Sequence, residues 1–144
     1  MNEVNLEIRT LKNILWIDFV LGFVAGIAGN LFTKFLTNLM NIPNDHIIVI
    51  SSVTILYSVF AFCLAQQKTI SFSLVKLLIN ANWFWTIISL ILLTYHADDA
   101  TGFGLAYLLL QVLTVAGLAF WEGVQLQLVV RAHNRSKSGI NIDK

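Results

Sequence analysis

Apart from Lys34, which lies near the end of its stretch, three charged side chains lie within otherwise apolar stretches of the 144-residue sequence, namely Asp18, Lys76 and Glu122. Charged groups are costly inside a membrane, so they usually mark ion pairs, proton relays or ligand sites there. Counted along a helix, these residues and Asn80 all lie about 6–12 Å from the same side of the membrane. We therefore expect Asp18, Lys76, Asn80 and Glu122 to converge on one polar layer.

Two interpretations of this polar layer stay open. In the functional one, Lys76 neutralises one carboxylate and Asn80, one helical turn further on, donates a hydrogen bond to the other. That arrangement would make a proton- or solute-responsive site open to the cytoplasm. In the structural one, the layer is a buried ion pair, or the carboxylates only reach the lipid headgroups. The structural interpretation is favoured because water can approach all of these depths.

Other patterns that would indicate chemistry are missing from the sequence. It has no H-E-x-x-H motif, no nucleophile elbow, no P-loop and no glycine-rich dinucleotide motif. His46 and His96 are expected on one side of the membrane, but two ligands without a third do not make a metal site. We therefore expect no enzyme activity, no metal and no cofactor. A net charge of +1 without a basic stripe also gives no reason to expect a nucleic-acid partner.

The composition predicts that lipid surrounds these residues. Hydrophobic residues make up 57% of the chain and charged residues 12%, with a mean hydropathy of +0.75. Soluble domains carry about 25% charged residues. A helix that crosses a bilayer needs about 20 predominantly apolar residues. Four stretches satisfy this requirement, at 14–36, 47–65, 72–95 and 102–130.

Short polar links between these stretches predict the fold. The links contain turn-forming residues, including the single proline, Pro43, and they force successive helices to lie as antiparallel neighbours. We predict an all-α, transmembrane four-helix up-down-up-down bundle. It forms one integral membrane domain over residues 1–144, and the polar tail at 132–144 is expected to be flexible.

The distribution of basic residues predicts the orientation of the bundle. Lysine and arginine accumulate in cytoplasmic segments of membrane proteins. Here they occur before the first stretch, between the second and third, and after the fourth: Arg9, Lys12, Lys68, Arg131, Arg135, Lys137 and Lys144. The other two links contain neither type, although Lys34 lies near that side. Both termini are therefore predicted to lie in the cytoplasm.

Several residues are candidates for packing between helices. Gly22-x-x-x-Gly26 in the first stretch would let another backbone approach closely, within the chain or in a dimer. Gln111 lies near the middle of the fourth stretch, where an unpaired amide is most costly. Trp83 lies deep in the third stretch, where packing is a more common role than ligand stacking.

The third and fourth stretches also carry a resemblance. Asn80-x-x-Trp83, followed by Gly104-x-Ala106-x-x-x-x-Gln111 and then Glu122, resembles a group of small bacterial four-helix membrane proteins without an assigned function. The resemblance covers residues 14–127. It implies the fold and a location in the bacterial inner membrane, but no activity.

Two functions are compatible with these observations. The first is an accessory or structural subunit whose partners are the lipid bilayer and another membrane protein. The second is a small transporter or channel that works as an oligomer. Dimerisation through Gly22 and Gly26, with a water-filled cavity reaching Asp18 and Glu122, would favour transport. A dry and fully packed interior would favour the accessory role.

Overall fold

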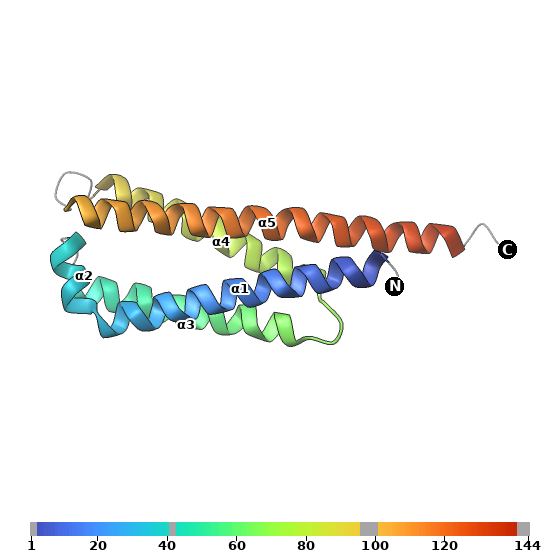
Figure 1. Ribbon diagram of the computed structural model, residues 1–144, viewed down its shortest axis with the longest axis horizontal. Coiled ribbons are helices and arrows are strands. Elements are labelled where there is room, and N and C mark those ends of the chain that lie inside the picture. Colours follow the sequence, from blue (N-terminus) through green and yellow to red (C-terminus); the bar gives the residue numbers. More distant parts are fainter. Residues whose placement is uncertain (1–2, 41–42, 96–100, 141–144) are drawn as a thin grey trace.

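The computed structural model describes residues 3–40, 43–95 and 101–140, which form five α-helices (Figure 1). The helices are α1 (Glu3–Leu31), α2 (Thr33–Met40), α3 (Asn44–Gln66), α4 (Phe72–Tyr95) and α5 (Gly102–Ile140). All but α2 are long and apolar enough to cross a membrane. The predicted all-α class is thus present, together with four helices that are long and apolar enough to span a membrane.

The long helices are apolar on their outer faces as well as on their inner ones. Leu31 and Leu56 are 74% and 72% exposed, and Phe84 and Leu110 are also largely exposed. Helices that are apolar on all sides belong either in the core of a large protein or in lipid. Because this bundle leaves its outer faces uncovered, its surface is that of a multi-pass membrane protein.

The first predicted helix is longer and less continuous than expected. The prediction of one helix over 14–36 is wrong, because α1 already begins at Glu3 and gives way to the short α2 after Phe32. The Thr33 hydroxyl donates to the carbonyls of Gly29 and Asn30, both at 2.8 Å, and the Asn30 amide donates to the Gly26 carbonyl at 3.0 Å. Side chains that bond to the preceding turn in this way bend helices.

The remaining boundaries agree with the prediction except at the C-terminal end. α3 and α4 lie close to the expected 47–65 and 72–95. α5 continues to Ile140, so the segment from 132 onward, expected to be flexible, is helical as far as the structure describes it. This segment contains no proline, and its first glycine is Gly139, so nothing interrupts the helix earlier. The predicted links at 41–42 and 96–99, and Lys144, lie outside the described residues.

The helices associate as two pairs. α1 packs along α3, and α4 packs along α5, while α1 and α5 join the two pairs. α3 and α4 have only slight contact. Both chain ends lie at one end of the bundle and α2 lies at the opposite end (Figure 1).

Two groups of buried apolar side chains lie at different levels of the bundle. The larger group, here called the terminal core, comes from all four long helices and comprises Leu11, Leu15, Ala61, Leu64, Ala65, Val75, Leu78, Leu126 and Val129. The smaller group, the α2 core, comprises Leu36, Met40, Ile47 and Leu108. The candidate site lies between these two cores.

The predicted glycine motif is used inside the chain. A Cβ atom at Gly22 would lie 3.1 Å from the Cβ of Ser58, and one at Gly26 would lie 2.6 Å from Ile55 Cγ1 and 2.9 Å from the Ser51 carbonyl oxygen. These contacts are on α3, so the small residues let α1 and α3 approach closely. This face of α1 is therefore covered by α3.

Candidate carboxyl site and adjoining cavity

Each of the four long helices contributes one polar side chain to a cluster near the middle of the bundle. The four residues are Asp18 of α1, Tyr57 of α3, Asn82 of α4 and Glu122 of α5. Asp18 is 3% exposed and Glu122 is fully buried. We call these four residues the carboxyl cluster.

The hydrogen bonds of the carboxyl cluster follow the two helix pairs. Within the α1–α3 pair, the Tyr57 hydroxyl donates to Asp18 Oδ2 at 2.7 Å. Within the α4–α5 pair, the Asn82 amide donates to Glu122 Oε2 at 3.1 Å. Asp18 and Glu122 come close enough across the two pairs to influence each other electrostatically. Each pair thus supplies one carboxyl group and one neutral donor, and the carboxyl groups meet where the pairs face each other.

The carboxyl cluster has an unusual charge balance. In the described part of the chain, the groups that act on the two carboxyls are Tyr57, Asn82 and the carboxyls themselves, and no basic side chain is among them. Oxygen Oε1 of Glu122 is buried without a hydrogen-bond partner in the structure. A buried charge usually has a countercharge, because desolvation costs several kcal/mol per ion. Two unpaired carboxylates at this place would therefore be very costly.

The predicted polar layer is only half correct in its membership. Asp18 and Glu122 come together, but Lys76 and Asn80 are exposed on another face of α4. The buried face of α4 is formed by Val75, Leu78, Asn82, Thr86 and Ser89, at spacings of three and four residues. Lys76 and Asn80 are rotated away from this face because each residue turns the helix by about 100°. Asn82 therefore occupies the place that was assigned to Asn80.

Tyr57 is the residue of the carboxyl cluster that sequence reasoning missed. It lies in an apolar stretch, and a tyrosine there is often only a large apolar side chain with a polar tip. The one available signal was its distance from either end of the stretch, because interfacial tyrosines lie near span ends. A hydroxyl at mid-span needs a partner, and here the partner is Asp18.

The terminal core closes one side of the carboxyl cluster. Leu15 precedes Asp18 on α1, Ala61 follows Tyr57 on α3, Leu78 precedes Asn82 on α4, and Leu126 follows Glu122 on α5; all four apolar residues belong to this core. They therefore lie toward the end of the bundle where the chain begins and ends. The expectation of a site open toward the termini is not met, because packed apolar side chains fill that direction.

A cavity of about 450 Å³ lies on the other side of the carboxyl cluster. Asp18, Tyr57 and Asn82 line one end of it, and residues of the α2 core, including Leu36 and Met40, line the other. Most of the remaining wall is apolar. The interior of the bundle is thus well packed toward the termini and hollow toward α2.

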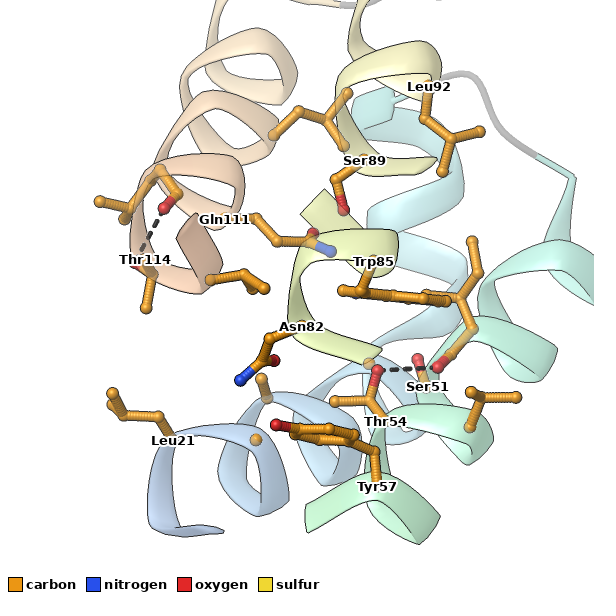
Figure 2. Close-up of a pocket in the computed structure, with 18 of the residues that line it drawn as sticks. Leu21, Ser51, Thr54, Tyr57, Asn82, Trp85, Ser89, Leu92, Gln111 and Thr114 are labelled. Atoms are coloured by element: carbon orange, nitrogen blue, oxygen red, sulfur yellow. Dashed lines mark hydrogen bonds between the residues drawn. The ribbon is translucent and has the colours of Figure 1, made fainter. Parts of the chain in front are cut away.

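Further polar groups project into this cavity from α4 and α5 (Figure 2). The Ser89 hydroxyl and the Gln111 amide both point into the space between the helices, and the Trp85 ring extends across it. Ser89 is 1% exposed, and its Oγ atom has no hydrogen-bond partner in the structure. The Gln111 side chain, which is predicted to pack between helices, therefore lines a cavity.

The cavity also opens sideways between the helix pairs. Its wall includes Leu21, Val53, Phe84 and Leu110, which are also exposed on the outer surface of the bundle. The slight contact between α3 and α4 leaves one such side uncovered. Trp83, by contrast, faces outward and does not line the cavity.

No group of three or more metal-binding side chains occurs within residues 3–40, 43–95 and 101–140. Comparison with known proteins adds no assignment: no family model, curated protein or solved structure matches the chain. The functional argument therefore rests on the carboxyl cluster and its cavity.

Proposed function

We propose that this chain is a non-enzymatic, multi-pass protein of a bacterial inner membrane that acts as a small proton-linked carrier. In this proposal the long helices alternate in direction, and both termini are cytoplasmic. The orientation is supported by the basic residues, which flank the chain ends and the α3–α4 link, whereas Asp45 lies at the opposite side.

The proposal rests on two adjacent carboxyl groups, Asp18 and Glu122, which we call the acid pair. This pair lies at the end of an internal cavity and has no basic partner in the described chain. Ionisable groups inside a membrane span usually mark ion or proton pathways. Two adjacent buried carboxyl groups cannot both ionise cheaply, so such pairs share a proton. Asp18 and Glu122 are therefore proposed to hold one proton between them.

The division of the carboxyl cluster between two helix pairs suggests how this proton acts. With the proton present, Asp18 and Glu122 can share a hydrogen bond and hold the α1–α3 pair against the α4–α5 pair. With the proton lost, two negative charges face each other in a medium of low dielectric constant and repel. Proton release is therefore proposed to weaken the contact between the pairs and widen the cavity between them.

If the chain is instead an accessory subunit, the first of the two functions predicted from the sequence, the same residues should behave differently. A purely structural cluster would tie four helices together but would keep its protons over the whole physiological pH range. Dimerisation through Gly22 and Gly26 does not support the carrier, because α3 covers that face of α1. The cavity that reaches Asp18 does support it, because a dry and fully packed interior is the expected mark of an accessory subunit.

Infrared spectroscopy of the full chain in lipid nanodiscs tests the proposal. We expect a band from a protonated carboxyl group that disappears reversibly as the pH is raised within the range in which the helices stay folded. Asp18→Asn and Glu122→Gln should each alter or remove this band. Asp45→Asn, which changes an exposed carboxyl group at the start of α3, should leave it unchanged.

A pH-independent band would contradict the carrier. If the two variants then changed only the melting temperature, the carboxyl cluster would be structural and the chain would be an accessory subunit. Tyr57 is the other titratable side chain that acts on the pair, and the Tyr57→Phe variant separates its contribution from that of the carboxyl groups.

A further inference from the structure

We propose that the cavity binds a lipophilic organic cation whose positive charge lies against Asp18, the member of the carboxyl pair that lines the cavity. This inference names the ligand class of the proposed carrier and rests on that function. It draws on three features of the cavity: its size, its acidic end and its apolar walls.

The size of the cavity is that of a small-molecule site. Small-molecule sites occupy about 300–1,000 Å³, whereas an engineered apolar cavity that stays dry measures about 150 Å³. The cavity here measures about 450 Å³. Its wall also contains the buried Ser89 hydroxyl, which points inward and has no hydrogen-bond partner in the structure. An unpaired buried hydroxyl is costly, so a ligand atom that accepts its hydrogen bond would be favoured.

The acidic end selects a cation. Asp18 is part of the cavity wall. Glu122 is fully buried and does not line the cavity, but it is the partner of Asp18 in the carboxyl cluster. In the described chain no basic side chain acts on this pair, so a bound cation would supply the missing countercharge. Tyr57, Trp85 and Tyr107 also line the cavity, and the faces of aromatic rings attract cations.

The walls and the opening select a lipophilic compound. Apart from the polar groups already named, the cavity is lined mainly by leucine, isoleucine, valine and other apolar side chains. Its lateral opening passes the exposed side chains of Val53 and Phe84, which would face lipid acyl chains. A compound that partitions into the bilayer could therefore enter through the lateral opening. A hydrated ion would meet few polar groups in this opening to replace its water ligands.

Binding of the cation is proposed to displace the proton of the acid pair. The O–H bond of the protonated carboxyl group breaks, the proton passes to the solvent, and the carboxylate left behind pairs with the cation. The charge of the site is thus conserved: one proton leaves for each monovalent cation that enters. Tyr57 and Asn82 continue to donate their hydrogen bonds to the two carboxyl groups throughout.

A pair of probes with the same shape and opposite charge tests this inference. Tetraphenylphosphonium and tetraphenylborate are titrated into the full chain in nanodiscs of uncharged lipid, with empty nanodiscs as the background. We expect the cation to bind at least about tenfold more tightly than the anion to the protein. Calorimetry in buffers of different ionisation enthalpy should show release of about one proton per bound cation, as the exchange requires.

Variants locate the binding site. Asp18→Asn should weaken binding of tetraphenylphosphonium at least about tenfold, and Asp45→Asn should leave it unchanged. Ala81→Phe places a large side chain in the cavity wall without altering the carboxyl cluster. It should abolish binding while the carboxyl band in the infrared spectrum stays as pH-sensitive as in the unmodified chain.

The possible failures can be told apart. Equal binding of both probes, or binding that Ala81→Phe does not change, would overturn the cation site and point to a cavity that holds lipid chains. The proposed carrier would survive that result if the carboxyl band remained pH-sensitive. A carboxyl band that does not respond to pH would instead remove the proton-linked function, on which the cation site rests.

Discussion

At the scale of single residues, the site depends on which polar side chains face inward. Asp18 and Glu122 could be found from the sequence because charged residues are rare in apolar stretches. The residues that contact Asp18 and Glu122 could not be identified in this way, because polar uncharged residues are common in the apolar stretches. Asn80 and Asn82 are two positions apart on one helix, and only the rotation of α4 set by its neighbours decides that Asn82 is buried. Lys76 is predicted to face inward because it offers a countercharge, but the cost of burying its own charge keeps it outside.

The two asparagines provide a matched test of this assignment. Asn82→Ala removes the amide that donates to Glu122 Oε2 and leaves this buried carboxyl group with one hydrogen bond fewer. We expect a loss of about 1–3 kcal/mol of stability. Asn80→Ala changes an exposed side chain and should stay within about 0.5 kcal/mol of the parent. Thermal unfolding in detergent measures both, and similar losses for the two variants would contradict the assignment.

At the scale of the helices, hydropathy predicts the spans well and their ends less well. α4 has the predicted bounds because polar links flank it on both sides. The break after Leu31 depends on hydrogen bonds from Asn30 and Thr33 to the preceding turn, and sequence alone does not show whether such side chains bond inward or outward. The extension of α5 arises because the tail is polar but still helix-forming, and hydropathy cannot distinguish a polar helix from a flexible end.

The contact between α1 and α3 leads to a prediction about two glycines. Gly26→Ala would place a methyl group against the backbone of Ser51 and Ile55 on α3. We expect the helices to separate slightly, with a loss of about 1–3 kcal/mol of stability. At Gly117 on α5 an added Cβ would meet nothing within 4 Å, so Gly117→Ala should be neutral or slightly stabilising. An equal loss of melting temperature in both variants would show that α1 and α3 do not pack as described.

At the scale of the whole molecule, the association of the helices in two pairs was beyond the reach of the sequence. Short links predict that neighbours in sequence pack together, yet α3 and α4 hardly touch and α5 packs on both α4 and α1. The cavity follows from this departure, because a bundle with four equal contacts would have filled the space with side chains. Hydropathy could not reveal it, since apolar residues line the cavity as they line a packed core.

The proposed orientation predicts which ends of the helices are accessible from outside the cell. In a Cys63→Ala background, Asp45→Cys should react with a membrane-impermeant maleimide in intact cells. Ser136→Cys, near the end of α5, should react only after the membrane is permeabilised. Both positions are exposed in the structure, so a lack of reaction reflects the membrane and not burial. The reverse pattern would place the termini outside.

That Asp18 and Glu122 share one exchangeable proton is tested most directly by counting protons. The full chain in nanodiscs is taken through a pH jump, and a dye in weak buffer records the protons released, with the Asp18→Asn, Glu122→Gln double variant as the reference. We predict that the unmodified chain releases about one proton more than the double variant, because two adjacent carboxyl groups share one. Equal release by the two proteins at every pH where both are folded would contradict the proton-linked site.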